Sequence, residues 1–331
     1  MAGKQVFNGL DALRGYAAIA VLVFHSSGLL GMTWLFPSGY LSVDLFFAMS
    51  GFVIAHSYQK LILERGWVWF MKVRIKRFLP LYVLGGVFGL VRVAGLLAVG
   101  SDTRGWVAAA VAYFAFLPAP VSPFSGGAMA PLNAPAWSLL YELYANLVLA
   151  IILPWLTNRL LALIIFVTGT ILLTAALNGI GLVGYNLSDF GLGFVRTFFS
   201  ISMGVSLYRL RRHIPTAGIH PIVLPIIVIA VVQLPPNPMY SFAFVLFGSP
   251  LILAAGVASS ASNVASRYGA SSSFAIYALH VPILGIASGV ISRMNLASEL
   301  ATGLIIVACA IFAPYVDRHF DRPLRYSLKP A

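Results

Sequence analysis

The sequence predicts an all-α, polytopic membrane protein folded as a bundle of transmembrane helices. Of its 331 residues, 60% are hydrophobic and only 9% are charged, and the mean hydropathy is +0.92. Soluble domains carry about 25% charged residues, so this composition excludes them. Apolar segments of membrane-spanning length also recur along the whole chain.

A transmembrane helix needs about 20 consecutive apolar residues, and ten segments meet this requirement. They are residues 12–31, 39–58, 79–99, 137–156, 160–177, 191–209, 219–235, 241–258, 271–291 and 298–316. A further run, 105–121, is short and leads into PAPVSPFSGGAMAPLNAP. We expect this run to be re-entrant or peripheral and covered by protein; if it crosses, the count is eleven. The whole chain, 1–331, is predicted to be one membrane domain without an appended soluble domain.

Basic residues set the expected orientation. The loop at 60–77 contains Lys60, Arg65, Lys72, Arg74, Lys76 and Arg77, and such clusters face the cytoplasm. With ten spans, both termini are cytoplasmic, and we expect a location in the bacterial cytoplasmic (inner) membrane. The net charge of +12 is thus typical of membrane orientation, and we expect no nucleic-acid partner. A single cysteine, Cys309, and scattered histidines predict neither a disulfide nor a metal site.

Arg14 and His25 are eleven residues apart in the first apolar segment. Three helical turns place both on one stripe, roughly 16 Å apart along the axis. Ionisable groups inside the membrane are costly and indicate a functional site by default. Two simpler interpretations are that Arg14 anchors the helix at the membrane boundary and that His25 bonds a neighbouring backbone carbonyl.

Two carboxylates and a second histidine are also predicted to lie at membrane depth. Asp44 and Glu142 fall about 8 Å below the outer ends of their helices, and His280 about 14 Å above the inner end of its own. Glu142 shares one face of an apolar helix with other polar groups, since Ser138, Glu142 and Asn146 are spaced by four. Each residue alone is explained by helix packing, but all of them together favour a site.

Arg74 and Arg77 lie three residues apart directly before Pro80. Basic residues at this position often serve only topology and lipid headgroup contact. Paired guanidiniums, however, bind phosphate groups bidentately. The pair therefore predicts a site for a phosphate-bearing cytoplasmic ligand.

Together these segments resemble the membrane-bound acyltransferase-3 family. NGLDALRGYAAIAVLVFH is similar to its LDxLRxxA start with Arg and His eleven apart, and GYLSVDLFFAMSGFVI, RIKRFLPLY, WSLLYE and YALHVP match later family segments in order. Ser42 and Met49 depart from the usual residues without removing a reactive group. The resemblance implies transfer of an acyl group, often acetyl, from cytoplasmic acyl-CoA to a hydroxyl of a sugar or other glycosylated acceptor.

The chemistry of acyl transfer then suggests roles for the polar residues. A histidine near neutral pKa suits deprotonation of the acceptor, so His25 is the expected base, with Asp44 or Glu142 supporting it. His280 is a second base, an oxyanion donor or a substrate contact. Arg14, Arg74 and Arg77 are expected to hold the phosphates of acetyl-CoA, which is a donor substrate and not a resident cofactor. Contacts to the substrate are expected from Tyr277, Ser138, Asn146 and Trp137.

Alternatives remain open at this stage. Transfer through an acyl-histidine is as compatible with the sequence as direct transfer. A proton-coupled transporter or flippase would use the same intramembrane His, Asp and Glu groups as a relay. A purely structural membrane subunit would leave all of them without a function.

Overall fold

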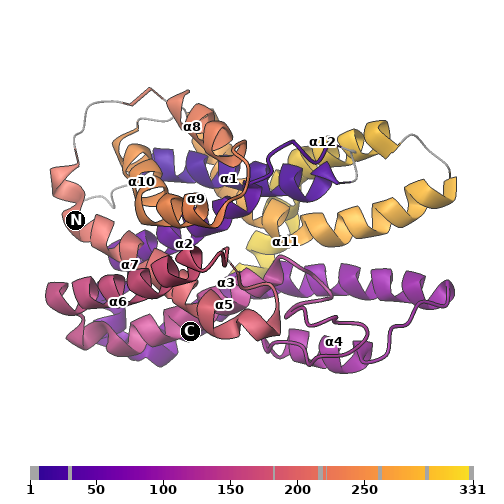
Figure 1. The fold of residues 1–331 in the computed structure, drawn as a ribbon, viewed down its shortest axis with the longest axis horizontal. Helices are drawn as coiled ribbons and strands as arrows, with labels where there is room; N and C mark the ends of the chain where they lie inside the picture. The colour runs from indigo at the N-terminus through magenta and orange to yellow at the C-terminus, as the bar shows by residue number, and fades with distance from the viewer. Residues whose placement is uncertain are drawn as a thin grey trace.

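The computed structural model describes residues 7–28, 32–181, 183–214, 219–220, 222–259, 263–294 and 298–327. Within these ranges the chain is helical, with no strands beyond isolated β-bridges. The α-helices are α1 (Asn8–Ser27), α2 (Ser42–Val53), α3 (Gln59–Ala98), α4 (Trp106–Phe114), α5 (Ala136–Ile152), α6 (Asn158–Leu177), α7 (Phe190–Leu210), α8 (Val223–Val232), α9 (Pro238–Ala243), α10 (Ser249–Ala258), α11 (Asn263–Met294), α12 (Ser298–Val316) and α13 (Arg322–Ser327). Short 3₁₀ segments are η1 (Gly39–Leu41), η3 (Leu153–Trp155), η4 (Leu187–Asp189) and η5 (Arg211–His213), and π-helical turns are η2 (Ile54–Tyr58), η6 (Phe244–Gly248) and η7 (Asp317–Asp321). The all-α prediction is confirmed, and most long helices run along the long axis of the molecule (Figure 1).

Seven helices in the described part of the chain are long and apolar enough to cross a membrane. One of them, Gly39–Ala98, is 60 residues long and includes two of the expected spans. Helix α8 has only 10 residues, about 15 Å of helix, although a full span was expected at 219–235. The polytopic membrane architecture stands, while the count of ten spans stays a prediction. The end of the first expected span, 29–31, lies outside the described residues.

Residues 60–77 form no irregular loop but belong to α3. The helix is interrupted at Gly66, whose φ of 81° is outside the helical region and suits a residue without a side chain. The basic run that includes Arg74 and Arg77 therefore continues directly into the apolar half of α3. This continuity fixes both guanidiniums on a regular helix, directly before its apolar half.

The expected re-entrant run at 105–121 contains only the nine-residue helix α4. About 14 Å of helix cannot cross a hydrocarbon core of about 30 Å. Two tyrosines attach α4 to α3: the Tyr82 hydroxyl donates to the Tyr113 carbonyl (3.0 Å) and the Tyr113 hydroxyl donates to the Tyr82 carbonyl (2.9 Å). The Tyr82 hydroxyl thus satisfies one backbone carbonyl of α4. The re-entrant course of residues 105–121 stays a prediction.

Helices α1 and α11 pack side by side and in parallel. A Cβ added to Gly269 would lie 1.8 Å from the Asp11 carbonyl oxygen, and one added to Gly15 would lie 2.9 Å from the Gly269 Cα. Only glycine permits such close backbone approach. Ten residues beyond Gly15 is His25, and eleven beyond Gly269 is His280, so the same register brings the two histidines together.

Helices α2 and α7 approach each other as closely. A Cβ on Gly51 would lie 2.0 Å from the Ile201 carbonyl oxygen, and one on Gly204 would lie 1.9 Å from the Ala48 carbonyl oxygen. Small residues at these crossings are typical of membrane helix pairs. The close packing sets Asp44 of α2 against α7.

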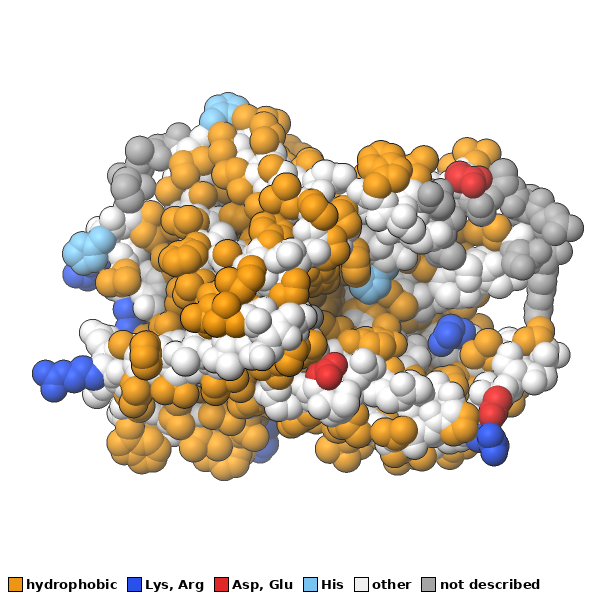
Figure 2. Space-filling model, viewed as in Figure 1, with side chains coloured by type: hydrophobic (Ala, Val, Ile, Leu, Met, Phe, Trp, Pro, Cys, Tyr) orange, Lys and Arg blue, Asp and Glu red, His pale blue; other side chains and the backbone are white. Residues whose placement is uncertain are grey.

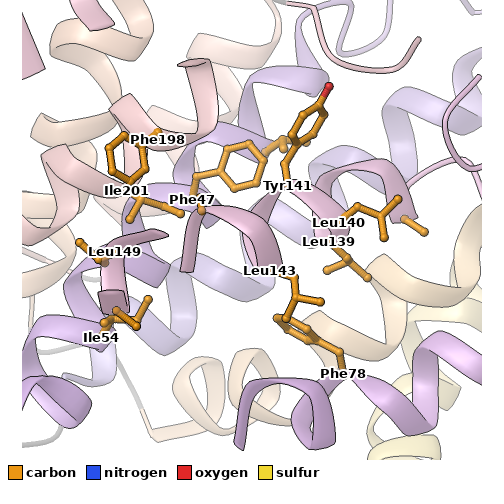
Figure 3. Close-up of a cluster of buried hydrophobic side chains, with 14 of the residues drawn as sticks. Phe47, Ile54, Phe78, Leu139, Leu140, Tyr141, Leu143, Leu149, Phe198 and Ile201 are labelled. Atoms are coloured by element: carbon orange, nitrogen blue, oxygen red, sulfur yellow. The ribbon is translucent and has the colours of Figure 1, made fainter. Parts of the chain in front are cut away.

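A large apolar core joins α2, α3, α5 and α7. Figure 3 shows part of it, with Phe47, Phe78, Leu139 and Ile201 directed among these helices. Much of the outer surface is apolar as well (Figure 2); Phe166 of α6, for example, is 72% exposed. A protein with apolar side chains both inside and outside is suited to a lipid environment.

Candidate active site

A cavity opens among α1, α2, α3, α5 and α11, at the end of the bundle that carries the basic part of α3. It contains about 680 Å³ of space, part of it open to solvent. Six of the residues expected in a site line it together: Arg14, Arg74, Arg77, Ser138, Glu142 and Tyr277. Four helices, α1, α3, α5 and α11, therefore bring these six predicted residues into one place.

Arg74 and Glu142 form a buried ion pair in the wall of this cavity. The Ser50 hydroxyl donates to Glu142 Oε1 (2.6 Å), and Arg74 Nη2 donates to Ser50 Oγ (3.2 Å). Arg74 was expected to bind ligand phosphates beside Arg77, but its side chain is only 5% exposed. The ion pair accounts for this burial, since a buried guanidinium requires an anionic partner.

Arg14 and Arg77 are the more accessible cations of the cavity. Arg14 Nη1 lies 3.3 Å from Asp11 Oδ1, and the Arg14 side chain is 21% exposed. Arg77 is half-buried and has no hydrogen bond or ion pair with any residue that the structure describes. These two guanidiniums are thus the ones available to an anionic ligand.

Hydroxyl groups form the deep end of the cavity. Tyr277 Oη and Ser138 Oγ lie 2.5 Å apart, and the Tyr277 hydroxyl is also 3.3 Å from the Pro135 carbonyl oxygen. Both side chains are buried. They place two neutral hydroxyl groups in this part of the cavity wall.

The two histidines form a pair beyond Tyr277. The ring centroids of His25 and His280 are 5.1 Å apart with the planes at 83°, and those of Tyr277 and His280 are 6.1 Å apart. His280 Nδ1 lies 2.9 Å from the Ile276 carbonyl oxygen and 3.0 Å from that of Tyr277. Both neighbours accept only, so Nδ1 donates and carries the proton.

This tautomer leaves Nε2 of His280 with a free lone pair when the ring is neutral. Nε2 is buried and has no hydrogen-bond partner among the described residues, and the same is true of His25 Nδ1. Buried polar atoms normally have partners. The His25–His280 pair therefore offers unoccupied hydrogen-bonding groups inside the bundle.

Asp44 does not contact His25 but forms an ion pair with Arg196 of α7. Arg196 Nε donates to Asp44 Oδ1 (2.9 Å) and Nη2 donates to Oδ2 (2.6 Å), while the Ser200 hydroxyl lies 3.3 Å from Oδ1. Asp44 and Arg196 are 0% and 2% exposed. Glu142 likewise pairs with Arg74, so neither carboxylate bonds His25 in the described part of the chain. Support of that ring by a carboxylate stays a prediction.

The remaining expected contacts lie outside the cavity lining. Trp137 faces the Arg196 guanidinium, with Cζ 5.7 Å from its ring. Asn146 is fully buried, and its amide has no hydrogen-bond partner among the described residues. The roles of both in substrate binding stay predictions.

Arg196 and Ser50 were not singled out from the sequence. Arg196 is a cation inside the apolar run FGLGFVRTFFS, so the general cost of intramembrane charge would have identified it. Ser50 gave no such signal, because serines are common in membrane helix contacts. Its bond to Glu142 depends on the meeting of α2 with α5.

Comparison with known proteins identifies the family of the chain. A protein family described as an acyltransferase domain matches residues 7–316. The chain belongs to the acyltransferase-3 family. The resemblance found in its motifs is thereby confirmed, and the protein is a membrane acyltransferase.

Relatives among curated proteins match parts of the chain. It is 37% identical over 181 residues to protein 2 in the picA locus of Rhizobium radiobacter, covering 50% of this chain and 93% of that protein. It is 34% identical over 87 residues to the O-acetyltransferase OatA of Staphylococcus aureus strain NCTC 8325 / PS 47, covering 24% of this chain but only 13% of OatA. No solved structure matches the chain significantly.

Proposed function

We propose that this acyltransferase transfers an acyl group, most simply acetyl, from cytoplasmic acyl-CoA to a hydroxyl of a sugar or other glycosylated acceptor. The observation that carries the proposal is a cavity with Arg14 and Arg77 at its accessible end and Tyr277 at its deep end, beside the histidine pair. Guanidiniums suit the phosphates of CoA, and the thioester then lies at the buried end of the cavity, beside Tyr277. The name of the relative OatA supports O-acetylation.

In this proposal His25 removes the proton of the acceptor hydroxyl as its oxygen attacks the thioester carbonyl carbon. Hydroxyls of Tyr277 and Ser138 are placed to donate to the oxyanion that forms. When the carbon–sulfur bond breaks, the imidazolium returns the proton to the CoA thiolate, which leaves as the thiol. An acyl-histidine route uses the same groups, with the ester formed in a second step.

The proposed setting is the bacterial cytoplasmic membrane, with about ten spans and both termini in the cytoplasm. The basic residues at the inner end of α3 support this orientation. A proton-coupled transporter is not favoured, because the family is one of acyltransferases. Two of the carboxylates that such a relay needs are also occupied by arginines.

Replacing Arg77 by Gln is expected to weaken acetyl-CoA binding about tenfold or more, because a charge-assisted hydrogen bond contributes about 1.5–3 kcal/mol. Isothermal titration calorimetry of the purified protein measures this change. Lys72→Gln is the matched control, since Lys72 is exposed on the same helix and is absent from the cavity lining. Equal affinities in the two variants would assign Arg77 to membrane topology alone.

His280→Gln is expected to keep more acyl transfer than His280→Asn. A Gln side chain carries its oxygen near the position of Nε2, whereas Asn reproduces only the group at Nδ1. The comparison is made on base-labile label incorporated from radiolabelled acetyl-CoA by isolated membranes, over a range of pH. If Asn is the better replacement and the pH profile keeps its shape, His280 only fixes the helix backbone.

A further inference from the structure

A second hollow lies on the outside of the bundle, far from the histidine pair. This groove runs between α6, α7 and the α9–η6 segment and contains about 1300 Å³ of space, part of it open to the surroundings. Its lining is mostly apolar and includes Ala162, Phe166 and Leu173 of α6 with Phe242 and Leu246 of the opposite wall. In a membrane such a groove is open to lipid, so hydrocarbon and not water is its natural occupant.

The length of the groove suits one leaflet of a bilayer. Its lining runs along α6 from Asn158 to Leu173, which is about 22 Å at 1.5 Å per residue. Half of a hydrocarbon core of about 30 Å is about 15 Å. An extended acyl chain therefore fits with its head beside Asn158 and its tail toward Leu173.

The head end of the groove is basic. Arg209 lines it and is held in place by hydrogen bonds from Nη1 to Asn158 Oδ1 (2.8 Å) and from Nη2 to the Leu156 carbonyl oxygen (2.7 Å). Three more arginines belong to the same helix ends: Arg159 at the start of α6, and Arg211 and Arg212 in η5, directly after α7. None of these four arginines has an ion pair with an acidic residue in the described part of the chain. Blue side chains project at the left end of this face in Figure 2, beyond the apolar surface.

We propose that this groove binds one anionic glycerophospholipid, with an acyl chain between α6 and α9–η6 and the phosphate beside Arg209. A zwitterionic lipid would offer the same chain but would also bring a cation to the basic cluster. Four unpaired positive charges therefore favour a lipid with net negative charge, each contributing at the membrane surface. This inference is independent of the proposed catalytic reaction, since no residue of the groove lines the other cavity.

Native mass spectrometry of the delipidated, purified protein tests the proposal, with phosphatidylglycerol and phosphatidylcholine of identical chains as probes. Phosphatidylglycerol is expected to remain bound at least tenfold more than phosphatidylcholine. Ala162→Trp and Thr170→Trp, which fill opposite parts of the groove, are expected to remove this retention. Leu163→Trp is the matched control, because Leu163 is exposed on α6 but outside the lining.

Arg209→Gln should keep chain binding but reduce the preference for phosphatidylglycerol severalfold. Retention of phosphatidylglycerol by both tryptophan variants at the level of Leu163→Trp would overturn the site. Equal retention of both lipids by the wild type would overturn its selectivity for anionic headgroups. Thermal unfolding of each variant in detergent identifies any that fail to fold, and the second tryptophan variant then decides the result.

Discussion

Replacing His25 by Ala is expected to reduce acyl transfer by about 10²- to 10⁴-fold, the usual contribution of a general base. The ring lies at the end of α1, beside His280 and near the deep end of the cavity. Removing it leaves the arginines of the cavity in place. Acetyl-CoA binding should therefore persist while transfer is lost.

The measurement is the rate of base-labile acetyl incorporation by membranes that contain equal amounts of each variant. His213→Ala is a suitable control, because His213 is exposed in η5, which follows α7. Calorimetry with acetyl-CoA checks that the cavity of His25→Ala is intact. Transfer at the wild-type rate would remove His25 as the base and would leave His280 as the candidate.

Replacing Asp44 by Asn is expected to lower the free energy of unfolding by about 3–5 kcal/mol, as when one partner of a buried ion pair is removed. Arg196 would keep its charge with only neutral groups beside it, since the structure gives it Asp44 as its anionic partner. The Val183 carbonyl oxygen, 3.1 Å from Arg196 Nη1, compensates only in part. Loss of activity in this variant would then follow from lost folding and not from lost catalysis.

Denaturant titration of the protein in detergent measures the free energy of unfolding of Asp44→Asn and of the wild type. Asp102→Asn is the matched control: Asp102 also pairs with an arginine, Arg104, but both are exposed, where such pairs contribute little. Adding Arg196→Met to Asp44→Asn should recover part of the stability, because no uncompensated charge remains. Wild-type stability in Asp44→Asn together with lost transfer would give Asp44 a direct catalytic role.

Several features of the site could be predicted from spacing alone. Arg14 and His25 lie on one face of α1 because eleven residues make three turns, and Ser138 and Glu142 share a face of α5 for the same reason. Both pairs are local, so helical geometry suffices. Arg74 and Arg77 also lie on a regular helix, as their spacing of three before Pro80 predicted, although 60–77 as a whole was expected to be a loop.

Pairing between helices was not predictable in the same way. The sequence analysis identified two carboxylates and three arginines inside the membrane or at its edge. It could not pair them, because the sequence does not show which helices are in contact. Gly51 and Gly204 let α2 pack closely against α7, and this packing allows Asp44 to form its ion pair with Arg196. Glu142 similarly meets Arg74 only because α3 and α5 pack together.

By itself, therefore, the sequence determined the membrane class, the all-α fold, the family and most of the polar residues that line the cavity. Hydropathy and helical periodicity are properties of short segments, so both can be determined without knowledge of the fold. Only the tertiary structure decided that His25 has His280 as its neighbour and that both carboxylates serve arginines. Such contacts join residues that are 68 to 255 positions apart. Close packing of helices at glycines sets two of them, His25 beside His280 and Asp44 beside Arg196.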